Sequence, residues 1–272
     1  MRTGLASVVL AGGLVCGAAA AAPFPSAWLP REGEGYLIPP TWAERGLRYG
    51  TPDLVGLVER AARTVAEEDP GATLYVADLS LKTGAWTQWH RSHRNGCDAD
   101  LIFFAVDDAG RPRPMPRQMA PFNADGLAWT TNDDGDRVRL RFDTPRNWAL
   151  VRALVADEET QVVRIFVYDA LRARLLAYAE DVGENPALVA RAGEVLVQPG
   201  DSEPHNDHMH VRIAPPPGVE PIVPGQVPAP EVEAATYARA NANRAQAHRP
   251  KPHRLARHKK TKKAKKSVRK SA

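Results

Sequence analysis

The sequence predicts an α+β fold for the body of this 272-residue chain. Three observations support this prediction. Hydrophobic residues make up 43% of the chain and charged residues 25%, as in ordinary globular domains. Helix-like and strand-like segments follow one another without the regular βαβ rhythm of a doubly wound sheet. No internal repeat is present. A collagen-like or wholly disordered chain is therefore excluded.

Residues 1–22 have the layout of a secretory signal peptide. A positive start precedes an apolar stretch from Leu5 to Leu14, and a run of alanines ends just before Pro23. The stretch is short for a membrane-anchoring helix, and Val15 is bulky for the position before a lipidated Cys16. We therefore expect export to the periplasm or cell envelope, with no transmembrane helix in the mature chain.

The first elements of the body are predicted from composition and periodicity. Residues 23–50 are rich in Pro, Gly and Trp and should form an irregular, packed segment. A helix is predicted over 51–68, with Thr51 as N-cap, Pro52 at the first helical position and apolar residues at helical spacing. Apolar runs and alternation predict strands at 73–78, 101–106, 138–142, 162–167 and 208–213, helices at 148–156 and 170–179, and a polar irregular region at 107–137.

The composition changes after Ile213. Residues 214–230 hold seven of the 24 prolines and residues 231–247 are rich in alanine, so 214–247 is predicted to be a linker. The chain has 36 basic and 32 acidic residues, and 12 of the basic ones follow residue 248. The preceding part therefore has 24 basic and 32 acidic residues, a net charge of −8. We expect residues 23–213 to form the folded domain and 248–272 a disordered basic tail.

The basic tail has three interpretations. Export would place it near anionic envelope polymers, which favours electrostatic tethering. A solvated tail without a specific function is the second interpretation. Nucleic-acid binding, which lysine runs also resemble, is disfavoured by the predicted export.

The histidines of the body fall into two clusters. His90 and His93 lie in one segment, and the second segment, 205–210, contains the remaining three. Asp98 and Asp100 follow the first cluster. Imidazole and carboxylate groups are the natural ligands of zinc, so this segregation favours a divalent metal site. Surface histidines on an edge strand and in a loop are the alternative. The five histidines of the two clusters are His90, His93, His205, His208 and His210.

The alternation of side chains along a β-strand indicates which residues could share the metal. His208 and His210 are two residues apart on a predicted strand, so both point to one face while Met209 and Val211 point to the other. If this strand neighbours the strand after Asp100, an aspartate and a histidine can share a metal, with the His93 loop folding over as the third ligand. Cys97, the one cysteine of the mature chain, is either a further ligand or an inert buried thiol; we favour the latter.

These motifs resemble those of the penicillin-insensitive murein endopeptidases. The resemblance rests on SHRNGCDAD at 92–100 with His90 before it, on HNDHMHVR at 205–212, and on YGTPDLV at 49–55, and it covers about 35–215. The family is related to lysostaphin-type and D-alanyl-D-alanine metallopeptidases and to the hedgehog signalling domain. The resemblance implies a small antiparallel β-sheet that carries a zinc site, with helices packed beside it.

The resemblance also implies roles for individual residues. By position, His93, Asp100 and His210 would bind Zn²⁺, and His208 and His205 would be catalytic. His90 and Asp98 would serve a second metal position or support the first; we expect one functional zinc. The zinc would activate a water molecule that attacks a peptide cross-link of peptidoglycan, at D-alanyl–meso-diaminopimelate or a related bond.

Two functions from different classes remain at this point. The first is a zinc-dependent peptidoglycan endopeptidase. The second is a non-catalytic envelope- or peptidoglycan-binding protein with a structural metal site. His205 and His208 favour the enzyme, because a purely structural site does not need histidines beyond its ligands. A serine hydrolase is disfavoured, because the chain has no Gly-x-Ser-x-Gly motif.

Overall fold

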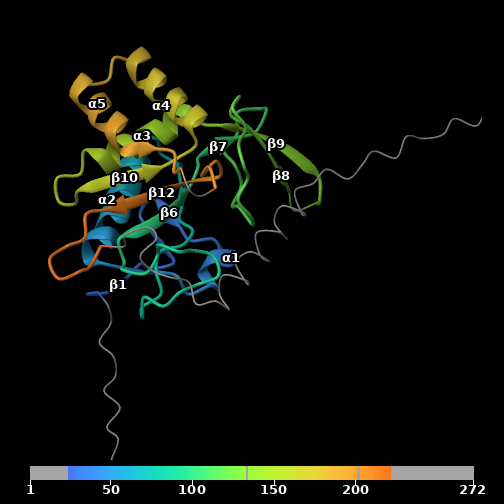
Figure 1. Cartoon of the computed structure of the whole chain (residues 1–272). Coiled ribbons are helices and arrows are strands. Elements are labelled where there is room, and N and C mark those ends of the chain that lie inside the picture. The colour runs from blue at the N-terminus through green and yellow to red at the C-terminus, as the bar shows by residue number, and fades with distance from the viewer. Residues whose placement is uncertain (1–23, 133, 201–202, 222–272) are drawn as a thin grey trace, which may run out of the picture. The chain divides into compact units, whose positions relative to one another are not determined.

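The computed structural model describes residues 24–132, 134–200 and 203–221. The described residues form a mixed α+β fold with several small sheets (Figure 1). Its helices are α1 Pro40–Ala43, α2 Pro52–Glu68, α3 Thr144–Val155, α4 Asp169–Asp181 and α5 Pro186–Val195. Its strands are β1 Ala27–Trp28, β2 Glu32–Gly33, β3 Tyr36–Leu37, β4 Tyr49–Gly50, β5 Leu74–Tyr75, β6 Asp98–Ile102, β7 Ala105–Val106, β8 Leu127–Thr131, β9 Arg137–Phe142, β10 Val162–Phe166, β11 Leu196–Val197 and β12 His208–Ile213.

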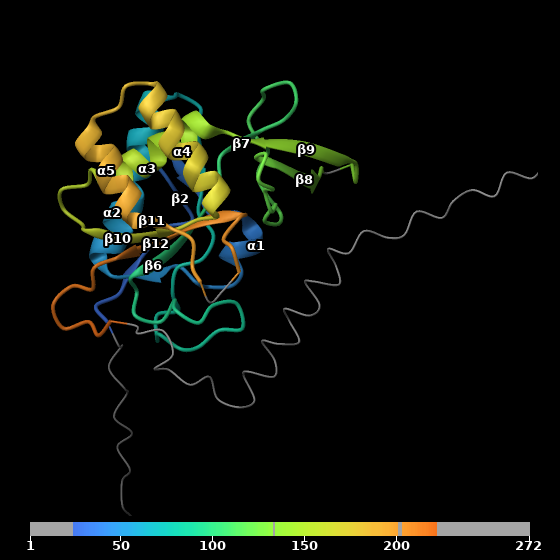
Figure 2. The ribbon, with the colours of Figure 1, turned by 45° about the horizontal axis from the view of Figure 1, so that its top comes forward.

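The central sheet has four strands in the order β11-β10-β12-β6. Its β10–β12 and β12–β6 pairs are antiparallel, and only the edge pair β10–β11 is parallel. The smaller sheets are β1-β4, β2-β3-β5 and β7-β9-β8. In two views α3, α4 and α5 lie on one side of the central sheet, and the segment between β5 and β6 lies on the other (Figures 1 and 2). The predicted small sheet with flanking helices is therefore present.

Helix α2 confirms the predicted helix and its cap. The Thr51 hydroxyl oxygen accepts a hydrogen bond from the Leu54 backbone N–H at 3.2 Å, and Pro52 occupies the first turn. Its apolar stripe is buried, and each buried Val or Leu side chain stabilises the fold by about 1.5–3 kcal/mol. The buried stripe consists of Leu54, Val55, Leu57, Val58, Ala61, Ala62 and Val65.

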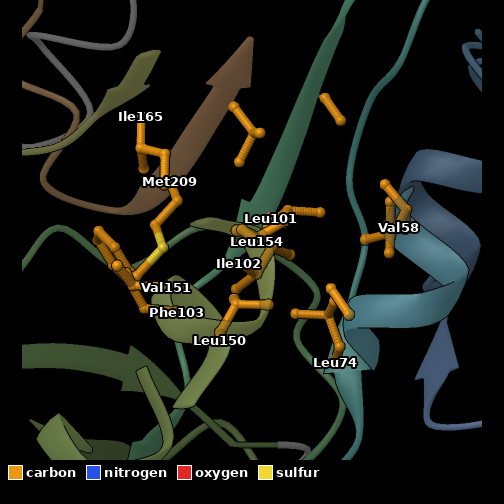
Figure 3. Packing of buried hydrophobic residues seen from close by; sticks show 14 of the residues in the cluster. Val58, Leu74, Leu101, Ile102, Phe103, Leu150, Val151, Leu154, Ile165 and Met209 are labelled. Carbon is orange, nitrogen blue, oxygen red and sulfur yellow. The ribbon is translucent and has the colours of Figure 1, made fainter. Parts of the chain in front are cut away.

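The helix side of the central sheet is filled by apolar side chains. Met209 and Ile165 lie side by side from β12 and β10, and Val151 of α3 lies next to Met209 (Figure 3). All three side chains have 0% of their surface exposed. This close packing holds β12 from its inner face, so the opposite face is left to position polar side chains.

Two predicted elements differ from the structure. The strand expected at 101–106 begins earlier, at Asp98, and is interrupted after Ile102. The side chain of Asn147 replaces the strand ladder there, accepting from Phe104 N–H at 3.1 Å and donating to Phe104 O at 2.7 Å. The region 107–137, expected to be irregular, contains β8, which is paired along its whole length with β9.

Other boundaries shift because of local capping. The helix expected at 148–156 begins at Thr144, because the Asp143 side chain accepts from Arg146 N–H. Helix α5 was not expected; it begins after Asn185, whose side chain accepts from Ala187 N–H at 2.9 Å. Neither cap was recognised in the sequence, and both use the common Asx chemistry of helix starts.

The segment after β12 stays on the domain surface at first. Val219 is buried, and Asn95 Nδ2 donates to the Glu220 backbone oxygen at 3.0 Å. The predicted signal peptide, most of the linker and the basic tail lie outside the described residues. Among the described residues, no helix is both long and apolar enough to cross a membrane.

Candidate metal centre

Two neighbouring strands carry most of the candidate ligands. β12 pairs antiparallel with β6, and His210 lies directly opposite Asp100. Met209 and Val211 enter the core on one face, so His208 and His210 share the other, as the alternation of a strand requires. The pairing thus brings together two segments that are more than a hundred residues apart in the chain.

The Asp100 carboxylate lies at the centre of the histidine cluster. Its Oδ1 is 3.3 Å from His93 Nε2, 3.3 Å from His208 Nε2 and 3.3 Å from His210 Nδ1. Its Oδ2 is 3.5 Å from His90 Nδ1. Asp100 is 0% exposed, and neither of its oxygens forms a hydrogen bond within the described residues. Such a buried carboxylate is costly unless a cation or proton satisfies it.

The spacing of these atoms fits a divalent metal ion. In a tetrahedral site with ligands at about 2.0–2.1 Å, neighbouring ligand atoms are about 3.3–3.4 Å apart. The three nitrogen–oxygen separations of 3.3 Å around Asp100 have this value. The potential ligand atoms lie within 4.8 Å of one another in two groups, one of His90, His93 and Asp100 and one of His205, His208 and His210.

Hydrogen bonds select the ring nitrogens that face Asp100. His93 Nδ1 lies 2.7 Å from the Leu79 backbone oxygen, which can only accept, so Nδ1 carries a proton and Nε2 is the nitrogen that faces Asp100. His210 Nε2 lies 2.8 Å from Asp98 Oδ1, which leaves Nδ1 bare toward Asp100. Arg212 Nε donates to the same Asp98 oxygen at 2.6 Å and balances its charge. Partners of this kind orient histidine ligands in metal sites.

His90 contacts the cluster from its outer side. Its ring stacks on His93 with centroids 4.1 Å apart, and its Nε2 lies 2.8 Å from Asp78 Oδ2. Asp78 is fully buried and also accepts from Arg45 Nη1 at 2.7 Å. His90 therefore links the cluster to a second buried carboxylate, and Asp98 lies behind His210.

A β-bulge places Asp78 against the site. Ala77 N–H donates to Asp100 O at 2.8 Å, and Asp100 N–H donates to Asp78 O at 2.9 Å. Two successive residues thus oppose one, and bulges of this kind redirect side chains near functional sites. The sequence analysis missed Asp78, whose only signal was its position at the end of a predicted apolar strand.

His208 and His205 each form a further hydrogen bond outside the contacts with Asp100. His208 Nδ1 is 2.6 Å from Asp207 Oδ1, an arrangement that orients the ring. His205 Nδ1 donates to the Glu203 backbone oxygen at 2.8 Å, and its ring centroid lies 5.1 Å from that of His208. With φ of 48°, His205 is the only described residue other than glycine in the left-handed region. Strained backbone of this kind concentrates at functional sites.

Electrostatics separate the histidines into two states in the metal-free site. Burial opposes protonation, but the negative charge of Asp100 raises the pKa of His93 to about 9 and, together with Asp207, that of His208 to about 10. Burial and the neighbouring charges of His208 and His210 lower the pKa of His205 to about 4. At neutral pH His205 is therefore uncharged, with a bare Nε2, while His93 and His208 hold protons that a metal would displace.

Cys97 takes no part in this arrangement. Its thiol is buried, and burial together with the charge of Asp98 raises its pKa to about 12. Among the described residues it belongs to neither group of potential metal ligands. It packs as a neutral side chain.

Comparison with known proteins gives one family and several relatives. The sequence model of a family described as penicillin-insensitive murein endopeptidase matches residues 15–268. A protein named penicillin-insensitive murein endopeptidase from Klebsiella pneumoniae subsp. pneumoniae is 27% identical over 191 residues, 70% of this chain and 62% of the relative. One of the same name from Escherichia coli O1:K1 is 28% identical over 186 residues, 68% of this chain and 60% of the relative. The matched part is therefore about three fifths of the length of these relatives.

Proposed function

The chain belongs to the penicillin-insensitive murein endopeptidase family, and from this premise we propose that it is a zinc-dependent endopeptidase that hydrolyses peptide cross-links of peptidoglycan. One observation carries the proposal. Among the described residues, the buried Asp100 carboxylate has no hydrogen-bond partner, and it is surrounded by imidazole nitrogens at the separation of metal ligands. The names of the relatives support the substrate class.

The proposed zinc ligands are His93, Asp100 and His210. Leu79 O and Asp98 fix the rings of the two histidines so that the other nitrogen of each ring faces Asp100, where it can bind a metal. When bound, zinc supplies an activated water molecule and polarises the carbonyl group of the substrate. One zinc is proposed as functional, with His90 and Asp98 supporting it.

His208 and His205 are the proposed catalytic residues. Asp207 holds His208 Nδ1, so Nε2 is the atom directed at the site, where it can hold a proton and stabilise developing negative charge on the substrate oxygen. His205 has its Nδ1 proton engaged with Glu203 O and a bare Nε2. It is therefore better suited to accept a proton than to donate one.

The proposed bond is the D-alanyl–meso-diaminopimelate cross-link or a related one. This substrate lies outside the inner membrane, so the proposal requires export, which the predicted signal peptide would supply. No acyl-enzyme forms in such a reaction, so β-lactams would find no nucleophilic serine to modify.

The test is chelator-sensitive cleavage of purified cross-linked muropeptide dimers, with products identified by mass spectrometry. We expect dimers to become monomers, EDTA to stop the reaction, and zinc to restore it. Asp100→Asn should bind no zinc and cleave nothing, while Asp125→Asn, the same change at an exposed position, should behave as the wild type. A folded, zinc-loaded protein that leaves dimers intact would refute the proposed activity and favour a non-catalytic binding protein.

A further inference from the structure

Arg113 is a buried arginine that forms no ion pair with a carboxylate in the described part of the chain. The residue is only 6% exposed. Its Nη2 donates to the Gln118 backbone oxygen at 2.9 Å, whereas Nη1 has no hydrogen-bond partner within the described residues. The nearby Arg146 is different, because Asp69 and Asp143 neutralise it at 2.6 Å and 2.7 Å.

A buried charge with an unsatisfied hydrogen-bond donor destabilises the folded protein. Burial lowers the pKa of Arg113 to about 10, although the charges of Tyr75 and Asp207 oppose the change. Native proteins pair almost all buried polar groups, and an exception calls for an explanation such as a ligand. The guanidinium keeps its charge at neutral pH, so the ligand it lacks is an anion.

Arg113 lines a cavity of about 60 Å³. Tyr75 and Arg146 also line it, and apolar residues of the β6–β7 connection form much of the rest. Because one water needs about 10–15 Å³ of such space, there is room for a few waters or a group the size of a carboxylate.

The cavity and the candidate metal centre share strand β6. Ile102, which lines it, lies opposite His208 in the β6–β12 pairing and about 7 Å along β6 from Asp100. The chain that follows Arg113 is hydrogen-bonded to the segment just before β12, because Phe122 N–H donates to Asn206 O at 2.7 Å and Asn206 Nδ2 donates to Phe122 O at 3.0 Å.

We propose that Arg113 binds a free carboxylate of the substrate peptide, one to three residues from the scissile bond. This inference rests on the proposed function, and it names the feature of the substrate that the site recognises. Stem peptides of the diaminopimelate type carry free carboxylates on D-glutamate, on diaminopimelate and at D-alanine ends. The planar fork of a guanidinium matches a carboxylate with two parallel hydrogen bonds, and Nη1 is the donor left free for one of them.

The test pairs single changes in the enzyme and in the substrate. Cross-linked muropeptide dimers are prepared with each class of carboxylate converted in turn to a carboxamide. For the wild type, one conversion should lower kcat/KM by about 10- to 100-fold, as expected for loss of a charged hydrogen bond. Arg113→Gln should show the same loss on the unmodified dimer and no further loss on that amide. Arg164→Gln, a matched change at an exposed position of β10, should behave as the wild type.

A binding measurement separates this inference from the proposed function. Calorimetry with the monomeric muropeptide, as carboxylate and as carboxamide, needs no turnover. If no dimer is cleaved but wild type alone distinguishes the two monomers, the activity fails and the carboxylate site stands. If dimers are cleaved and Arg113→Gln responds to every amidation exactly as the wild type does, the carboxylate site is overturned and the activity stands.

Stability distinguishes a binding role from a structural one. If Arg113 is kept for its ligand, Arg113→Met should leave the thermal midpoint of the free protein unchanged or raise it, because a buried unpaired charge is removed. A marked fall in the midpoint would indicate that Arg113 serves the fold. Arg113→Lys, which keeps the charge but loses the fork, provides the second variant if Arg113→Met fails to fold, and it should retain only part of the discrimination between carboxylate and amide.

Discussion

At the scale of single residues, neighbouring hydrogen-bond acceptors determine which ring nitrogen of each histidine faces the site. Leu79 O engages one ring nitrogen of His93 and Asp98 engages one of His210, so the other nitrogen of each ring faces Asp100. Asp207 does the same for His208 from the other side. The chemistry of the site therefore depends on acceptors that are not ligands themselves, which is why their loss should change function without unfolding the protein.

The Asp207–His208 pair gives the first prediction. His208→Ala should lower kcat by about 10²–10⁴-fold, the usual contribution of a proton-handling group, and Asp207→Asn should lower it by about 10–100-fold because only the orientation of the ring is lost. Metal content, measured alongside, should stay at the wild-type level. Unchanged cleavage by His208→Ala would contradict the role assigned to it, and loss of zinc would make it a ligand.

The second prediction concerns pH. In the metal-free protein the folded-state pKa values of His93 and His208, about 9 and about 10, lie above the ordinary value of 6.5. Their contribution to stability is therefore complete below pH 6.5 and is lost as pH rises through 9 to 10. The thermal midpoint of chelator-treated protein should fall over pH 7–10, by about 2–4 °C for each kcal/mol lost.

Zinc should reverse this trend. Metal binding requires bare nitrogens, so zinc affinity should rise with pH, and so should the increase in midpoint that zinc produces. Differential scanning calorimetry with and without zinc, at matched pH values, measures both effects. A metal-free midpoint that is level between pH 7 and 10 would show that Asp100 does not hold these protons.

At the scale of elements, β12 couples the core to the site. Met209 is completely buried between two histidines whose side chains face the other way. The sequence predicted this alternation and the limits of β12, because a period of two with an apolar inner face is a local property of the chain. It did not predict the break after Ile102, because that break depends on Asn147, a residue 43 positions away from Phe104 that takes over its backbone hydrogen bonds.

The third prediction follows from this coupling. Met209→Ala should lower the free energy of unfolding by about 2–5 kcal/mol by leaving a cavity, and it should also weaken zinc binding because His208 and His210 lose their support. Removing the α5 cap with Asn185→Ala should cost about 1 kcal/mol and leave zinc affinity unchanged. Urea unfolding and zinc titration measure the two quantities. Equal effects of both variants on zinc affinity would contradict the coupling.

At the scale of the whole molecule, the charges are divided between body and tail. The chain up to residue 248 has a net charge of −8, and the 12 basic residues that follow have no acidic neighbours. The contacts of Val219 and Glu220 with the domain mean that a truncation should keep residues up to Pro221. A cut at Ile213 would remove part of the packed surface together with the tail.

The fourth prediction tests the role of the tail with the truncation after Pro221. The full mature chain should be retained on isolated sacculi at low salt and released as salt rises, because exposed charges are screened within about 10 Å at 0.1 M. A chain ending at Pro221 should fold and cleave dimers normally but be released at lower salt. Equal retention of both chains at every salt concentration would refute electrostatic tethering by the tail.

The sequence by itself determined the local features of this protein. It predicted the capped helix α2, the alternation of β12 and the two histidine clusters, because helix caps, strand periodicity and residue type are properties of neighbouring residues. Only the tertiary structure determined which distant residues come into contact with these features. Asp78 reaches the site through a bulge, Arg113 Nη1 has no hydrogen-bond partner among the described residues, and Asp100 lies among imidazoles from two segments. These relations arise from strand pairing and burial between residues far apart in the chain, and no local pattern encodes them.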